Sequence, residues 1–160
     1  PLEANLVIDT VLSSSPDHAM KATALIEKGK NFYTLGAQDP ANYKSAMDVW
    51  KQVASEESSD PVWLNQALTR IGTALEKSGD DNGAVATYYE VFKPSSVATP
   101  EFFWFYKAGF AAGRIYEVQQ KWNEAIRVYE IIAANEGPRA LEAKKRMQQI
   151  RLEHFIWDGE

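Results

Sequence analysis

The sequence predicts an all-α protein, and three observations lead to this fold class. Apolar residues recur at helical spacing, as in Leu64, Ala67, Leu68, Ile71 and Leu75. No run of alternating Val, Ile and Thr bounded by turn residues occurs, so strand signals are almost absent. Prolines and glycines divide the chain where helices would begin and end. We therefore expect eight helices, over about 3–13, 17–35, 41–55, 61–78, 81–93, 100–120, 122–135 and 138–156.

Four of the predicted helix starts share one feature, a capping residue directly before a proline. The pairs are Ser15-Pro16, Asp39-Pro40, Asp60-Pro61 and Thr99-Pro100. The side-chain oxygen of the first residue can accept from a free N–H of the first turn, and proline at the first helical position loses no hydrogen bond. Gly137 before Pro138 is expected to end the preceding helix. The segment from Lys93 to Thr99 is expected to be a loop.

The composition excludes several classes of protein. The chain has no cysteine, which excludes disulfides, cysteine nucleophiles and thiolate metal sites, although it does not fix the redox compartment. A net charge of -5 argues against a nucleic-acid binder, which would need many phosphate-neutralising Lys and Arg residues. No apolar run reaches the roughly 18 residues of a membrane span, so we expect no membrane insertion.

An internal repeat determines the expected architecture. From Gly72, an apolar residue, a glycine, an alanine and a tyrosine follow three, seven, twelve and sixteen positions later, at Leu75, Gly79, Ala84 and Tyr88. From Gly113 the same offsets give Tyr116, Gln120, Ala125 and Tyr129. From Gly29 they give Phe32 and Gly36, and after five inserted residues Tyr43, Ala46 and Trp50 follow in register.

Each repeated position has a physical reason. Gly29, Gly72 and Gly113 are expected where the two helices of a pair cross closely, and Ala46, Ala84 and Ala125 opposite them on the second helix. Gly36 and Gly79 are expected to end the first helix in a left-handed cap, the position that Gln120 occupies in the third repeat. The large side chains of Trp50, Tyr88 and Tyr129 are expected to fill the space toward the next repeat.

These small, aromatic, glycine and alanine positions resemble the consensus of the tetratricopeptide repeat family, over residues 19 to about 135. The resemblance implies a right-handed superhelix of antiparallel helix hairpins in a single domain, 1–160. Its parts would be the second helix of a preceding repeat (1–16), three repeats (17–58, 59–98 and 99–137) and a capping helix (138–157). We therefore expect the chain to begin inside a longer array.

The capping helix is expected to lie against the last hairpin through Ala143, Met147 and Ile150. Its basic residues are expected to face water, namely Lys144, Lys145, Arg146 and Arg151. The closing segment from Arg139 to Trp157 is similar to that of some bacterial cell-envelope proteins of this family. The resemblance therefore favours a bacterial envelope or periplasmic location over the cytoplasm.

The resemblance also implies a binding surface, because the first helix of each hairpin lines the concave face in this family. Positions there that are not needed for packing are Thr23, Ile26, Lys30, Tyr33 and Thr34 in the first repeat, Gln66, Thr69, Thr73, Glu76 and Lys77 in the second, and Lys107, Phe110, Arg114 and Glu117 in the third. Their mixed charges, donors and rings suit an extended or helical peptide. The family's clamp for acidic chaperone tails is not expected, because Ile26, Lys30 and Arg70 occupy clamp positions; Lys107 and Arg114 could still hold an acidic group.

The aromatic run Phe102, Phe103, Trp104, Phe105, Tyr106 and Phe110 has two interpretations. It can pack between the second and third repeats, beneath the loop that follows Lys93. It can also form an exposed patch that docks a partner or a second copy of the chain, giving a homo-oligomer.

No arrangement in the sequence supplies both a nucleophile and a base, so we expect no enzyme and no cofactor. His18 and His154 are far apart and are expected to be surface residues rather than metal ligands. The segment Asp80-Asp81-Asn82-Gly83 lacks the frame of a calcium loop and is expected to be a capped polar turn. The leading hypothesis is a scaffold that binds a protein or peptide. Alternatives are a self-associating structural segment and a domain that binds a small molecule or glycan.

Overall fold

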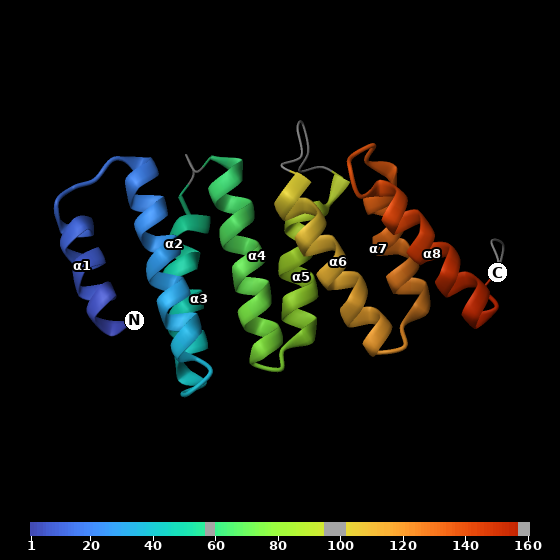
Figure 1. Cartoon of the computed structure of the whole chain (residues 1–160), viewed down its shortest axis with the longest axis horizontal. Helices are drawn as coiled ribbons and strands as arrows, with labels where there is room; N and C mark the ends of the chain where they lie inside the picture. The colour runs from blue at the N-terminus through green and yellow to red at the C-terminus, as the bar shows by residue number, and fades with distance from the viewer. Residues whose placement is uncertain (57–59, 95–101, 157–160) are drawn as a thin grey trace. The chain divides into compact units, whose positions relative to one another are not determined.

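The computed structural model describes residues 1–56, 60–94 and 102–156, and these residues are helical, with no strand. The helices run in chain order (Figure 1) as α1 (Leu2–Ser13), α2 (His18–Leu35), α3 (Ala41–Ala54), α4 (Pro61–Lys77), α5 (Asp81–Phe92), α6 (Phe102–Val118), α7 (Trp122–Ala134) and α8 (Ala140–His154). The all-α prediction is confirmed, and each predicted helix is present with similar ends. The Thr99-Pro100 start and most of the predicted loop after Lys93 lie outside the described residues.

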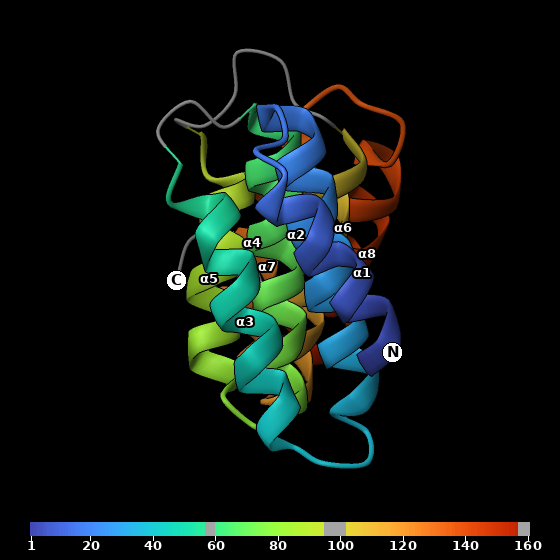
Figure 2. The same cartoon turned by 90° about the vertical axis from the view of Figure 1, so that its left-hand side faces the viewer.

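The chain divides into two compact units, Pro1–Ala84 and Val85–Glu160, with the division inside α5. In the first unit, consecutive helices pack on one another, and α2 also touches α4. Figure 2 shows α3 and α1 on opposite sides of α2. The core of this unit comes from one face each of α2, α3 and α4, and includes Leu25, Ile26, Val49, Trp50 and Ile71.

Trp50 explains why α2 carries a glycine at its crossing with α3. A Cβ on Gly29 would lie 2.5 Å from Cε2 of the Trp50 indole, so only glycine lets the ring lie against the α2 backbone. The buried indole Nε1 donates to the carbonyl oxygen of Ile26 at 3.2 Å. The ring also lies 6.0 Å from the Arg70 guanidinium on α4. Trp50 therefore fills the crossing of its own helix pair besides reaching the next helix.

The second unit repeats this packing in α6 and α7. A Cβ on Gly113 would lie 2.5 Å from Cζ of Tyr129, and one on Gly109 would lie 2.6 Å from Cδ1 of Ile132. The predicted facing alanines, Ala46, Ala84 and Ala125, are all fully buried. α8 closes this unit by packing on α7, with Ala143 and Ile150 buried as predicted.

The helix ends follow the capping predictions in part. Asp60 accepts a hydrogen bond from Val62 N at 2.9 Å, with Pro61 in the first turn, and Asp80 accepts one from Gly83 N at 2.9 Å. The predicted start of α4 at Asp60-Pro61 and the predicted capped turn at Asp80 are both confirmed. The Ser15-Pro16 prediction is wrong by two residues, because Asp17 caps α2 by accepting from Met20 N at 2.8 Å.

Two glycine predictions are wrong. Gly36 is not left-handed but has φ -57°, and a Cβ there would lie 2.5 Å from Cδ1 of Tyr43. Because Gly36 has no side chain, the ring of Tyr43, which follows the inserted segment, can pack against its backbone. Gly137 does not end α7, because that helix stops at Ala134. Gly137 instead packs against the ring of Phe102, and a Cβ on Gly137 would lie 2.6 Å from the ring atom Cδ1.

The third repeat has the left-handed cap although Gln120 replaces the cap glycine there. Gly79 has the predicted positive φ of 81°, and Gln120 adopts φ 57°. Gln120 thus holds the conformation of a cap glycine at a cost that glycine would not have. None of the helices among the described residues has the length and apolar character needed to cross a membrane.

Candidate functional site

The site lies in the second unit, where α6 and α8 stand in front of α7 (Figure 1). The residue spacing of α6 places five side chains on one face of the helix, three or four residues apart. They are Lys107, Phe110, Ala111, Arg114 and Glu117. The opposite face of α6 carries the glycines and alanines that pack on α7. The polar face is therefore left open toward α8.

An open pocket of about 680 Å³ lies along this face. We call it the α6–α8 pocket. It is lined by Lys107, Phe110, Ala111, Arg114, Glu117, Tyr129, Arg139, Glu142, Lys145, Arg146 and Gln149. All four candidates predicted from the third repeat, Lys107, Phe110, Arg114 and Glu117, are thus brought together.

A hydrogen-bonded network at Glu117 ties the three helices together. Tyr129 donates its hydroxyl proton to Glu117 Oε1 at 2.6 Å. Arg146 donates from Nε to the same oxygen at 3.0 Å and from Nη2 to Oε2. Gln149 accepts from Arg146 Nη1 at 3.0 Å, which fixes the guanidinium further. One carboxylate therefore links α6, α7 and α8.

This network changes the acidity of its members. Burial alone would raise the pKa of Glu117, but the hydrogen bonds from Arg146 and Tyr129 outweigh it and bring the pKa below its ordinary value. Burial and the neighbouring carboxylate raise the pKa of Tyr129 well above its usual range. The pKa of Arg146 is raised mainly by its hydrogen bond to Glu117. At neutral pH the site therefore holds a carboxylate, a phenol and a guanidinium.

A second charged pair sits where the chain enters α8. Arg139 donates from Nε and Nη2 to the two carboxylate oxygens of Glu142, both at 2.7 Å. Its guanidinium also lies over the ring of Phe110, 4.2 Å from the centroid. That ring packs 5.7 Å from Tyr129, measured between centroids. Phe110 is therefore held between an arginine and a tyrosine, with part of its ring exposed to the pocket.

The sequence did not identify the contribution of α8 to this site. Arg146 was expected only to face water; its side chain is 38% exposed, but its guanidinium pairs with Glu117. Arg151 also pairs, with Glu130 of α7 at 2.8 Å. Lys145 is exposed but lines the pocket, whereas its neighbour Lys144 is exposed and does not. The sequence analysis assigned Tyr129 to packing alone. In the structure this tyrosine also lines the pocket.

The candidates from the first two repeats belong to the first unit, and two of them are wrong. Ile26 is 2% exposed and Thr69 is 1% exposed, so neither side chain is open to a partner. Tyr33 is half-buried against Tyr43 and Trp50, with ring centroids 5.3 and 6.1 Å apart, and burial raises its pKa. This tyrosine therefore takes part in packing as well.

The remaining candidates of the first unit are at least partly exposed. Thr23, Thr34 and Thr73 bond to backbone carbonyls four residues earlier, and Lys30 pairs with Glu27 at 2.7 Å. Of the second-repeat candidates, Lys77 is exposed, whereas Gln66, Thr73 and Glu76 are half-buried.

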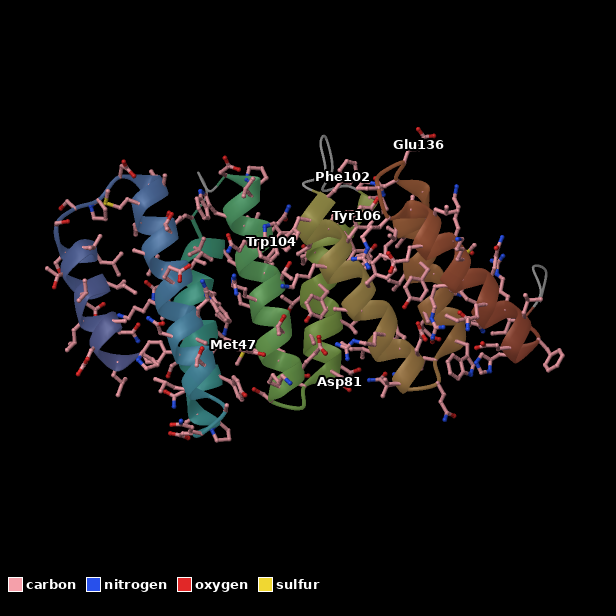
Figure 3. The ribbon with its side chains drawn as sticks, viewed as in Figure 1. Met47, Asp81, Phe102, Trp104, Tyr106 and Glu136 are labelled. Carbon is pink, nitrogen blue, oxygen red and sulfur yellow. The ribbon has the colours of Figure 1, made fainter. Side chains whose placement is uncertain are left out.

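The aromatic run is partly buried and partly exposed. Trp104, Phe105 and Tyr106 are buried, whereas Phe103 is 62% exposed. Figure 3 shows Phe102 and Tyr106 together at one end of α6, beside the α7–α8 connection that carries Glu136. Their rings stack with centroids 5.7 Å apart. The run is therefore divided between buried rings and one exposed ring, and whether the exposed ring docks a partner stays a prediction.

The histidines have separate structural partners. His18 begins α2 as predicted, and its Nδ1 lies 3.2 Å from Glu56. His154 ends α8 and stacks on Trp122, with ring centroids 3.7 Å apart. Among the described residues, no group of His, Cys, Asp and Glu is arranged to hold a metal ion.

Comparison with known proteins gives no relative: no family model, no curated protein and no solved structure matches the chain.

Proposed function

We propose that the protein is a non-catalytic interaction module of the tetratricopeptide type, which binds a peptide or protein through the first helices of its hairpins. The observation that carries this proposal is the α6–α8 pocket. It gathers every third-repeat residue that the family resemblance assigns to a concave binding face. The right-handed superhelix belongs to the same proposal.

The equivalence of two helix crossings supports the repeat assignment. Gly29 lies against Trp50, and Gly113 lies against Tyr129, so a glycine of the first helix meets a large ring of the second in both units. In both pairs the second helix also buries an alanine four residues before that ring, Ala46 or Ala125. The same three side-chain positions thus build both crossings.

The chemistry of the pocket favours binding over catalysis. Its carboxylates, Glu117 and Glu142, have pKa values below the ordinary range because arginines donate to them. The pKa of Tyr129 is raised well above neutrality. Each group is thereby held in one protonation state near neutral pH, whereas a general acid or base needs a pKa close to the working pH. Such fixed charges are suited to recognition.

A peptide-display selection tests the proposal. A random dodecapeptide library would be selected on the wild-type protein after depletion on Ala111→Trp, in which the indole occupies the α6–α8 pocket. Ala134→Trp is the matched control, since Ala134 is an exposed alanine of α7 outside the lining. Circular dichroism would verify that both variants stay helical.

The proposal predicts peptides that bind the wild type and Ala134→Trp and bind Ala111→Trp at least tenfold more weakly. If every enriched peptide binds all three proteins equally, the pocket is not the binding site and the proposed function is wrong. Recovery of no peptide at micromolar concentration would contradict it too.

Self-association is a second candidate, favoured by one specific observation. Phe103 is a large aromatic residue with 62% of its surface exposed, next to the edge of Trp104 at 4.7 Å between ring centroids. Aromatic residues, phenylalanine among them, are enriched in protein interfaces relative to the rest of the surface.

A further inference from the structure

Helix α1 buries a polar side chain and leaves its apolar ones uncovered. Asn5 is 5% exposed, whereas none of the apolar residues in α1, all of which the structure describes, is fully buried. Leu2, Leu6 and Val7 are 63%, 69% and 66% exposed. Leu12 packs against the core of the first unit but is only partly buried. The attachment of α1 therefore rests on little apolar burial.

Two polar contacts join α1 to α2. Asn31 donates from Nδ2 to Oδ1 of Asn5 at 2.9 Å, and Lys28 pairs with Asp9. The Nδ2 group of Asn5 is buried and has no hydrogen-bond partner in the part of the chain that the structure describes. A buried amide that cannot use all of its hydrogen bonds gains little from leaving water. These contacts therefore fix the position of α1 without contributing much free energy.

The opposite side of α2 is built differently. There Gly29 lets the Trp50 ring lie against the α2 backbone, and Leu25 and Ile26 are buried in the core shared with α3 and α4. Figure 2 shows α1 and α3 on these two sides of α2. One helix thus holds α3 through an apolar core and α1 largely through polar contacts. The two neighbours should therefore differ in how readily they separate from α2.

Helix α1 has little stability of its own. It is 12 residues long, and four of these residues are β-branched. A helix of this length is marginal in water, and β-branched residues, Asn and Asp lower its propensity further. The connection to α2 contains Ser15 at φ 57°, a left-handed conformation that a side chain disfavours. When its contacts to α2 break, α1 is therefore expected to unfold as well.

We infer that α1 is a latched helix, which opens from α2 and unfolds locally while α2, α3 and α4 stay packed. The latch consists of the Asn5–Asn31 hydrogen bond and the Asp9–Lys28 ion pair. Opening uncovers one side of α2, with Asn31 and Lys28 on it, and releases the α1 segment with its exposed leucines and valine. This inference concerns the first unit and does not depend on the proposed function.

Hydrogen exchange of the whole chain, followed by mass spectrometry, tests the inference. Amides of α1 are expected to have protection factors at least about 100-fold lower than those of α3, because α1 opens without the rest of the unit. Urea below the unfolding transition is expected to speed exchange in α3 more than in α1, because opening of α1 exposes less surface. Equal protection in α1 and α3 would mean one cooperative unit and overturn the inference. Complete lack of protection in α1 would overturn it too, since no latch would then exist.

Replacement of both amides tests the polar latch. Asn5→Leu/Asn31→Leu substitutes an apolar contact for the buried amide pair, so exchange in α1 is expected to slow by about tenfold. Thr10→Leu is the matched control, because it gives a similar gain in helix propensity at an exposed position of α1. It is expected to slow exchange in α1 by no more than about threefold. Equal exchange in the two variants would show that the amide pair does not limit the attachment.

Weakening the latch gives the opposite result. Asn31→Ala leaves the Asn5 amide without its hydrogen bond and is expected to speed exchange in α1 by about tenfold. Lys28→Gln is expected to speed it by about threefold, the effect of one partly exposed ion pair. Lys51→Gln breaks an ion pair with Asp48 within α3 and should leave α1 unchanged.

Asn31→Ala and Lys28→Gln also decide the case in which the two leucines pack poorly and exchange in α1 becomes faster. If both variants then speed exchange in α1 while Lys51→Gln does not, the latch is supported. If all three variants leave α1 equally protected, the polar contacts do not hold this helix and the inference is wrong.

Discussion

The phenol ring of Tyr129 lies against the backbone of Gly113, so close that a Cβ on the glycine would come within 2.5 Å of the ring carbon Cζ. The hydroxyl of the same tyrosine donates a hydrogen bond to Glu117, which lies one turn farther along α6 than Gly113. The residue that fixes the crossing of α6 and α7 thus also forms part of the pocket. Helix packing and the pocket lining are therefore coupled through one side chain.

Gly113→Ala is expected to destabilise the protein by about 1–3 kcal/mol, because the added methyl group must push the Tyr129 ring away from a buried position. Thermal and urea denaturation followed by circular dichroism measures the loss. Val118→Ala, on the same helix at an exposed position, is the control and should leave stability nearly unchanged. Wild-type stability in Gly113→Ala would mean that the helices do not cross this closely.

Gln120→Gly is expected to stabilise the protein by about 1 kcal/mol, because glycine adopts the left-handed conformation without the strain that a Cβ brings. The midpoint of thermal unfolding should rise accordingly. Gln120→Ala keeps a Cβ at the same φ and should give no such gain. A Gln120→Gly variant no more stable than Gln120→Ala would show that residue 120 is not left-handed.

Glu117→Gln is expected to destabilise the protein at pH 7 by about 1–3 kcal/mol, since the charged partner of Arg146 is lost. The ordinary pKa of this carboxyl, 4.5, applies to the unfolded chain, and the folded pKa is lower. The stabilisation is therefore complete above that value and is lost as pH falls through the folded pKa. Urea denaturation from pH 7 to pH 3 should show the wild type and the variant converging in acid. A difference between them that does not depend on pH would exclude the ion pair as its source.

Phe103→Ser tests the self-association alternative. If the exposed ring is the anchor of an interface, light scattering at rising concentration shows a dimer for the wild type and a monomer for this variant. Leu152→Ser, which removes an equally exposed apolar residue from α8, should leave the dimer intact. Trp104 is less suited to this test, because it is buried and its replacement would alter the fold. A wild type that stays monomeric at high concentration would remove this candidate.

The sequence predicts the helices and two of the glycine crossings because these depend on local spacing. Gly29 and Gly113 are recognisable, since glycine inside a helix is costly unless a neighbour needs the space. Gly36 could not be assigned correctly, because the five inserted residues bring Tyr43 back against it and remove the need for a left-handed turn. An insertion changes the partner of a residue without changing the residue itself.

The α6 wall of the pocket was predictable and the α8 wall was not. On α6 the glycine and alanine face marks the packing side, which leaves Lys107, Phe110, Arg114 and Glu117 on the other. α8 is rich in polar residues, so its sequence does not show which of its lysines and arginines turn toward α6. The distinction between Lys144 and Lys145 is a matter of helix rotation, which only the packing of Ala143 and Ile150 determines.

The Glu117–Arg146 bridge joins α6 to α8, two helices that are separated along the chain by α7. Arg139, Glu142, Lys145, Arg146 and Gln149 belong to α8 or directly precede it, so nearly half of the pocket wall depends on the packing of α8 against α7. Fraying of this one helix would remove that wall as a whole. The pocket therefore exists only while α8 is docked.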